Sequence, residues 1–128
     1  MEGYEVSEEI SKLPPRVQER LLRLQQLQQT LQSILVQKQN VELELTEIEQ
    51  TINELQKLAE DAIIYKAVGS LLVKSEKAKI TSDLNDRKEL LNVRASVLGK
   101  QEERLRGQLK DIQTKLQQDL GPVSPSQP

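Results

Sequence analysis

The side chains that most often carry out catalysis are missing from this chain. It contains no histidine and no cysteine, so neither an imidazole base nor a thiolate nucleophile is present, and it has no glycine-rich phosphate-binding loop. Carboxylates recur at helical spacing, as in Glu42 and Glu49, but without His or Cys nearby such pairs are typical of a solvated helix face. The sequence therefore predicts a protein that is not an enzyme, with no catalytic residue, no metal site and no cofactor.

The apolar residues are the ones whose pattern predicts a function, through hydrophobic contact with other chains. Among 128 residues there are two Tyr and no Phe or Trp, so the apolar content is almost all Leu, Ile, Val and Ala. This composition favours a coiled coil over a packed globule. The formal net charge of −2 disfavours a nucleic-acid partner, because phosphate binding needs an excess of Lys and Arg. No apolar run approaches the roughly 20 residues that cross a bilayer, and the acidic residues 1–6 do not resemble a secretory signal. We therefore expect a cytoplasmic protein with no membrane partner.

A heptad pattern predicts a first long helix over residues 14–61. Leu13-Pro14-Pro15 fits a helix start, because proline is tolerated in the first turn. From Val17 to Ala62, apolar residues then recur at alternating spacings of three and four, as in a coiled-coil seam.

A second heptad pattern predicts a helix that begins at Ser75, a good N-cap, and ends before Gly121-Pro122. Its seam contains a leucine or isoleucine at every seventh position, namely Leu84, Leu91, Leu98, Leu105 and Ile112. We expect three regions: a flexible acidic N-terminus over 1–13, a helix–hairpin–helix domain over 14–120, and a disordered proline-rich tail over 121–128.

The two seams fit each other as antiparallel partners in one register. Leu24 then faces Ile112, Ile52 faces Leu84, and the midpoint falls at Val68, between the two helices. The fold class predicted is mainly α: a long antiparallel two-helix coiled coil joined by a central β-hairpin.

Charged residues support the same register. Residues 42–61 carry seven acidic side chains and residues 74–94 carry six basic ones, so we expect ion pairs between the helices near the hairpin. Lys38 and Glu102 interrupt the seams in neighbouring layers. They form either a diagonal ion pair that sets the register or two side chains that extend into solvent.

The segment between the helices predicts a β-hairpin that assembles with other subunits. It is rich in β-branched and apolar residues, and Gly69-Ser70 suits a two-residue type II′ turn. Because both faces are largely apolar and an isolated hairpin is marginal in water, strands from other subunits should cover it. The alternative is an apolar helix-to-helix turn that packs on its own coiled coil. The candidate assembly residues are Ile63, Ile64, Tyr65, Val68, Leu71, Leu72 and Val73.

The helix ends farthest from the hairpin in sequence form a candidate binding surface. In the antiparallel register Val17 faces Asp119 and Leu116 faces Arg20, so these apolar side chains should be partly exposed. Exposed apolar groups suit a binder of many unfolded sequences, and the alternative is ordinary fraying of a coiled-coil end. The candidate client-binding residues at this end are Leu13, Val17, Leu21, Leu22, Leu24, Ile112, Leu116 and Leu120.

Three sequence stretches carry a family resemblance: residues 37–44 (QKQNVELE), 61–74 (DAIIYKAVGSLLVK) and 101–105 (QEERL). With two long helices around one hairpin, the chain resembles the archaeal-type beta class of prefoldin subunits over about residues 14–118. The resemblance implies a hexamer of two alpha-class and four beta-class subunits, whose hairpins form intersubunit β-barrels. It also implies an ATP-independent chaperone, or holdase, that binds unfolded polypeptides at its coiled-coil tips and delivers them to a group II chaperonin. The alternative is a structural homodimeric coiled coil, a scaffold or tether, for which the hairpin is dispensable.

Overall fold

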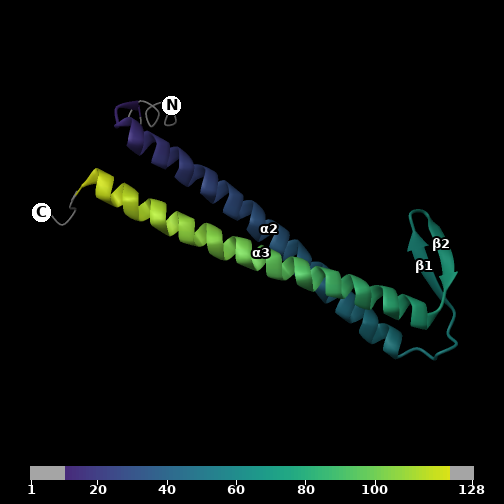
Figure 1. Ribbon diagram of the computed structural model, residues 1–128. Coiled ribbons are helices and arrows are strands. Elements are labelled where there is room, and N and C mark those ends of the chain that lie inside the picture. Colours follow the sequence, from purple (N-terminus) through teal and green to yellow (C-terminus); the bar gives the residue numbers. More distant parts are fainter. Residues whose placement is uncertain (1–10, 122–128) are drawn as a thin grey trace, which may run out of the picture. The chain divides into compact units, whose positions relative to one another are not determined.

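The computed structural model describes residues 11–121 and contains two long helices that are joined by a β-hairpin (Figure 1). The elements are α2 (Pro15–Gln56), β1 (Ile64–Val68), β2 (Leu71–Ser75) and α3 (Lys77–Leu120). This mainly helical architecture with one antiparallel hairpin is the predicted fold class. Residues 1–10 and 122–128 lie outside the described part, and with them most of the predicted flexible N-terminus and tail. Between residues 11 and 121, neither helix is long and apolar enough to cross a membrane.

The chain divides into two compact units. The terminal unit contains residues up to 35 and from 100 onward, and the hairpin unit contains residues 36–99. Each unit therefore contains a segment of α2 and a segment of α3.

Leucine, isoleucine and valine at seam positions form the core of each unit, as the heptads predict. In the terminal unit the buried seam residues are Val17, Leu27, Ile34, Leu105, Leu109, Ile112 and Leu116. In the hairpin unit they are Val41, Ile48, Leu55, Leu91 and Leu98. Burial of one such side chain contributes about 1.5–3 kcal/mol, so the seams stabilise the helices more than their intrinsic propensity does.

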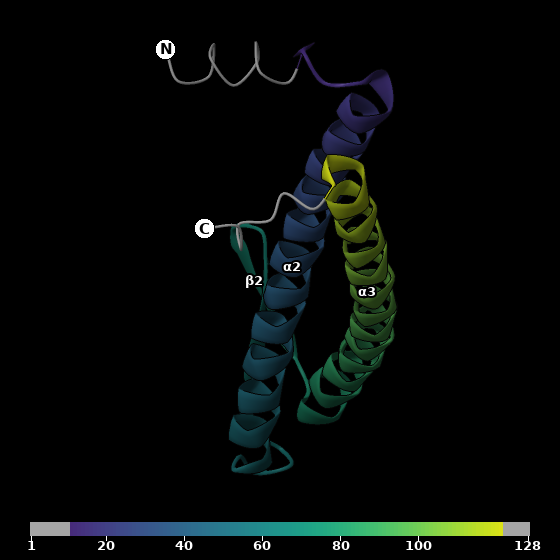
Figure 2. The ribbon, with the colours of Figure 1, turned by 90° about the vertical axis from the view of Figure 1, so that its left-hand side faces the viewer.

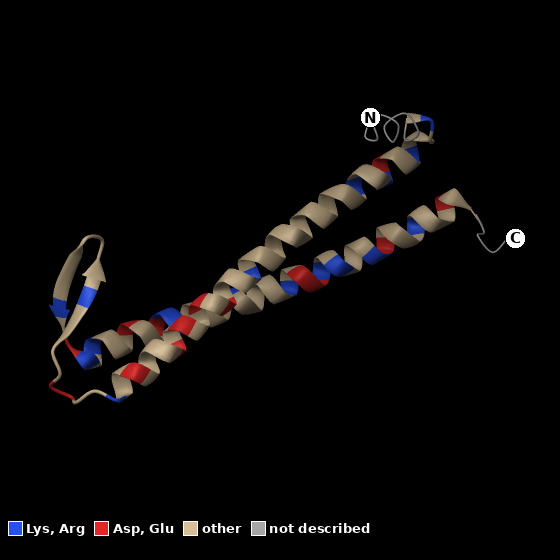
Figure 3. Cartoon of the chain, turned by 180° about the vertical axis from the view of Figure 1, so that it is seen from behind, with Lys and Arg blue, Asp and Glu red and all other residues tan. Residues whose placement is uncertain are grey.

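Ion pairs flank the seam of the hairpin unit, as the charge pattern predicts. Arg87 of α3 reaches Glu44 of α2 at 3.1 Å, and Lys88 reaches Glu49 at 3.5 Å. These pairs are largely exposed, so each contributes at most about 1 kcal/mol and they favour one register more than they add stability. In Figure 3, red (Asp, Glu) and blue (Lys, Arg) stretches of the ribbon occur together along this part of both helices.

The predicted diagonal pair of Lys38 with Glu102 involves residues of different units and stays a prediction. Within α3, Glu102 accepts a hydrogen bond from Arg106 at 2.8 Å.

Helix α2 ends at Gln56 rather than near residue 61, where the sequence pattern places its end. The N–H groups of Lys57 and Leu58 donate to carbonyls three residues earlier, at 3.2 and 3.1 Å, so the last turn tightens before the chain leaves the helix. The next seam position is Ala59, which is exposed and buries too little apolar surface to hold another turn against a partner.

Ser75 is the last residue of β2 rather than the N-cap of the second helix. It pairs with Ile64 in the strand ladder, and the carbonyl of Glu76 accepts the first helical hydrogen bond, from the N–H of Ile80 at 3.0 Å. A single residue therefore separates β2 from α3, whereas seven residues, 57–63, separate α2 from β1.

Candidate binding surfaces

The hairpin is a tight antiparallel pair that closes through Gly69 and Ser70. Val68 pairs with Leu71, which leaves a two-residue turn between them. Gly69 has a φ of 60° and Ser70 does not have a positive φ, as expected for the predicted type II′ turn.

Both faces of the hairpin present apolar side chains to solvent. Because side chains alternate along a strand, Leu71 and Val73 lie on one face and Tyr65 and Leu72 on the other. Leu72 is 73% exposed, Leu71 67% and Tyr65 59%. Among the assembly residues predicted from the sequence, Ile64 alone is half-buried. The alternative that this segment packs on its own coiled coil is therefore wrong.

The edges of the hairpin are also open within the described chain. Its sheet has two strands, so each strand has one edge with unpaired backbone N–H and C=O groups. Exposed edges and apolar faces together are what strand addition by another chain requires.

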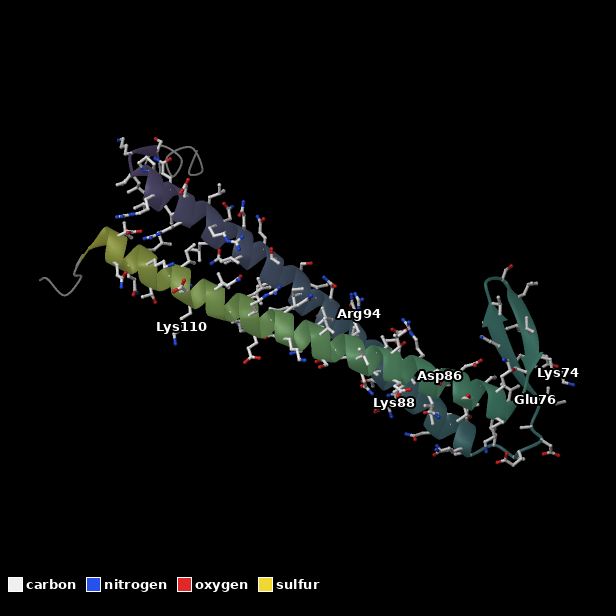
Figure 4. All side chains as sticks on the ribbon, in the orientation of Figure 1. Lys74, Glu76, Asp86, Lys88, Arg94 and Lys110 are labelled. Carbon is white, nitrogen blue, oxygen red and sulfur yellow. The ribbon has the colours of Figure 1, made fainter. Side chains whose placement is uncertain are left out.

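One face of the hairpin has a recess at its base. Lys66, Val68 and Val73 line it from the strands, Glu76 from the connection that follows β2, and Lys79 from the first turn of α3. Figure 4 shows Lys74 and Glu76 beside each other where β2 passes into α3. This face therefore meets charged side chains at its base and apolar ones toward the turn.

The terminal unit buries several side chains that the antiparallel register leaves without apolar partners. Val17 is 2% exposed and Leu116 6%, so the expectation that they are partly exposed is wrong. Ile112, which the register places opposite Leu24, is also buried, at 9%. The reason is the ionic closure of the helix ends: Asp119 of α3 pairs with Arg16 at 3.2 Å and with Arg20. The Arg16 side chain stays 69% exposed and that of Arg20 28%, so of the two Arg20 is the one placed to cover apolar surface that would otherwise face water.

Other candidate residues of the terminal unit do reach solvent. Leu22 is 58% exposed and Leu120 is 52% exposed, whereas Leu13, Leu21 and Leu24 are half-buried. Of the candidate residues, Leu22 and Leu120 are therefore the ones that this unit leaves open to a partner.

Exposed apolar residues outside the seams were missed by the sequence analysis. In the hairpin unit, Leu90, Val93 and Val97 are 49–60% exposed and line a groove together with Arg94. Arg94 donates a hydrogen bond to Gln37 of α2 at 3.2 Å across this groove (Figure 4). Their spacing of three and four is a helical stripe, a signal that could have been found by following positions beside the heptad seam.

Residues 11–121 contain no group of three or more acidic side chains placed to hold a metal ion.

Comparison with known proteins identifies close relatives. The chain matches the family model of the prefoldin subunit over residues 18–122. It is 48% identical over 114 residues to prefoldin subunit beta of Saccharolobus islandicus (strain L.S.2.15 / Lassen #1), which covers 89% of this chain and 90% of that protein. It is 42% identical over 112 residues to prefoldin subunit beta of Methanosarcina acetivorans, covering 88% and 96%. The crystal structure of the prefoldin beta subunit from Thermococcus strain KS-1 superposes with a TM-score of 0.79 at 41% identity, covering 87% of this chain and 97% of that one.

Proposed function

This chain belongs to the prefoldin beta subunit family, and on that premise we propose that it is the beta-class subunit of an ATP-independent holdase. The family consists of non-enzymatic chaperone subunits that form hetero-oligomers, so the prediction that the chain is no enzyme is confirmed. In this proposal four copies of the chain assemble with two alpha-class subunits. The complex binds unfolded clients in the cytoplasm and passes them to a group II chaperonin.

The exposed hairpin is the observation that carries the proposal. Six large apolar side chains between Ile63 and Val73 are each 47% or more exposed, on a two-stranded sheet that is marginal by itself. A chain that left these groups in water would aggregate, whereas strands of other subunits cover both the faces and the edges. The homodimeric scaffold, in which the hairpin is dispensable, gives no reason for this surface.

Client binding is assigned to the terminal unit because its exposed leucines are not needed for the coiled-coil core. Leu22 and Leu120 are more than half exposed, while the seam beside them is buried. Non-directional apolar contact suits clients that share no sequence. The buried candidates Val17, Ile112 and Leu116 then support this surface from below.

The test uses the assembled complex and matched leucines of one helix. Leu22→Ser in the terminal unit is compared with Leu43→Ser in the hairpin unit, since these two side chains of α2 are 58% and 57% exposed. Leu22→Ser, combined with Leu120→Ser, should lose most of the suppression of aggregation when a denatured protein is diluted into buffer. Leu43→Ser should keep that suppression. Equal effects of the two changes, measured by light scattering, would reject client binding at the terminal unit.

Delivery to a chaperonin is tested separately. A client held by the complex should refold on addition of a group II chaperonin with ATP, and the complex and chaperonin should comigrate. A client that stays bound, with no comigration, would remove this part of the proposal and leave the holdase part intact. Fractionation of cells that produce the protein tests the cytoplasmic location.

A further inference from the structure

The terminal unit contains a groove with an apolar floor and cationic sides. Leu27 and Ile112, each 9% exposed or less, lie at its floor. Arg20 and Arg23 line it from α2 together with Glu19, and Lys115 lines it from α3 together with Asp111, so cations outnumber carboxylates by three to two. A groove of this kind fits a segment that carries both apolar and acidic side chains.

The cations of this groove are not equally engaged. Lys115 pairs with Asp111, one of two carboxylates in the groove, at 3.2 Å, and Arg20 pairs with Asp119. Arg23 makes no ion pair with any residue of the described range 11–121. Arg23 is therefore the cation that the groove offers to a ligand.

A segment of complementary charge precedes the terminal unit's first helix in the sequence. Residues 1–10 contain four Glu and no Lys or Arg, a formal charge of −4. Residues 11–35 and 100–121 of the terminal unit contain nine Lys and Arg against five Asp and Glu, a formal charge of +4. The hairpin unit, with nine basic and eleven acidic residues, is negative. Attraction therefore favours the terminal unit over the hairpin unit as the partner of residues 1–10.

The described chain already turns back toward the helix before α2 begins. Gln18 donates hydrogen bonds from its side-chain amide to the carbonyls of Leu13, at 2.7 Å, and Ser11, at 3.2 Å. Residues 11–14 are thereby held beside the first turns of α2 (Figure 2). Ten further residues span up to about 33 Å, whereas Arg23 lies only about 12 Å along the helix from Pro15. The segment is long enough to reach the whole groove.

We propose that residues 1–10 dock in this groove of their own chain and compete with clients for the terminal unit. The glutamates face the cationic sides, and Tyr4, Val6 and Ile10 supply the apolar groups that a client would otherwise supply. Ile112 belongs both to the groove floor and to the buried residues that support the client-binding surface of the proposed function. The competition rests on that proposed function, whereas the docking itself does not.

Docking is measured with probes that the natural chain lacks, since it has no Cys and no Trp. Tyr4→Trp is combined with Gln108→Cys, and the new cysteine, which lies in the groove, is labelled with the fluorophore bimane. The labelled chain is then assembled with its partner subunits. Tryptophan quenches bimane at near contact, so we expect quenching that is lost in 1 M salt or when the four glutamates become Gln. Bimane at Lys110→Cys should stay bright, because Lys110 points away from α2 (Figure 4).

Two results of this measurement would overturn the docking. One is the absence of quenching that depends on the tryptophan. The other is quenching that disappears when labelled chains are diluted among unlabelled ones within the complex, since that assigns the segment to a neighbouring copy.

Competition is measured with an uncharged, apolar, fluorescent peptide as the client. Removing residues 1–10, or replacing them with a Gly-Ser segment of equal length, should tighten the Kd about threefold to tenfold. This range is expected if residues 1–10 leave the client-binding surface unoccupied in about a third to a tenth of the molecules. Equal Kd values for all three proteins would overturn the competition. If none of them binds the peptide, client binding at the terminal unit fails, and the bimane signal still decides the docking.

Discussion

A single charge placed on the hairpin should dismantle the assembly without unfolding the chain. Leu72 is 73% exposed in the single chain, so Leu72→Lys removes little from its own fold. Complete burial of a leucine contributes about 1.5–3 kcal/mol, and about three quarters of that, ~1–2 kcal/mol, is still to be gained when another subunit covers the side chain.

The loss is multiplied by the number of hairpins. With the four copies of the proposed complex, loss of this burial alone amounts to about 4–8 kcal/mol, a factor of about 10³–10⁶ in the assembly constant. An ammonium group that must be buried at each site adds several kcal/mol more. The mutant should therefore be found as separate subunits at micromolar concentration.

Native mass spectrometry of the chain co-expressed with the alpha-class subunit of the proposed complex measures this effect. Leu43→Lys is the control, because Leu43 is 57% exposed in the same unit but lies on α2. Circular dichroism should give the same helix content for both mutants. A Leu72→Lys complex of unchanged mass would refute the hairpin interface, and so would an equal loss of assembly in the Leu43→Lys control.

Three further predictions concern the stability of the chain. Leu27→Ala should lower the free energy of unfolding by about 2–5 kcal/mol and Leu22→Ala by less than about 0.5 kcal/mol, because these leucines of α2 are 3% and 58% exposed. Equal shifts of the urea denaturation midpoint would contradict the assigned seam. Gly107→Ala should raise the free energy of unfolding by up to about 1 kcal/mol. Gly69→Ala should lower it by about 1–2 kcal/mol. An added Cβ would meet no atom within 4 Å at either glycine, and of the two only Gly69 has a positive φ, so only there should alanine strain the backbone. Melting temperatures that shift in the same direction for both mutants would refute this reasoning. Asp119→Asn should accelerate amide exchange in the last turn of α3 about tenfold, since it breaks both ion pairs to α2; unchanged exchange would show that they do not close this end.

The regular parts of the fold could be predicted because they depend on local pattern. A seam of leucine, isoleucine and valine at heptad spacing specifies where two helices meet, and Gly69-Ser70 between β-branched runs specifies the turn. The element boundaries could not be predicted as well. Ser75 has the chemistry of an N-cap, but its backbone is used by the ladder with Ile64, a contact that local pattern does not reveal.

The candidate binding surfaces were predicted less completely than the fold. A register assigns each seam residue one partner across the helix pair, so Val17 opposite Asp119 looked exposed. Burial depends on all neighbours, and the ion pairs of Arg16 and Arg20 with Asp119 also hold the helix ends together. Leu90 and Val93 were missed for the opposite reason, because they lie beside the seam rather than in it.

The unequal connections of the hairpin to its two helices have a mechanical consequence. Only Glu76 lies between β2 and α3, so the hairpin and the first turn of α3 should move together as a rigid body. One residue inserted at this connection would rotate the hairpin by about 100° about the helix axis. The seven residues 57–63 instead form a loop between α2 and β1 that can accommodate an insertion or deletion. A hairpin held in a multi-subunit sheet would thus set the direction of α3 stiffly, and α2 would follow through the seam that it shares with α3. The direction of each coiled coil would then be set by a single residue.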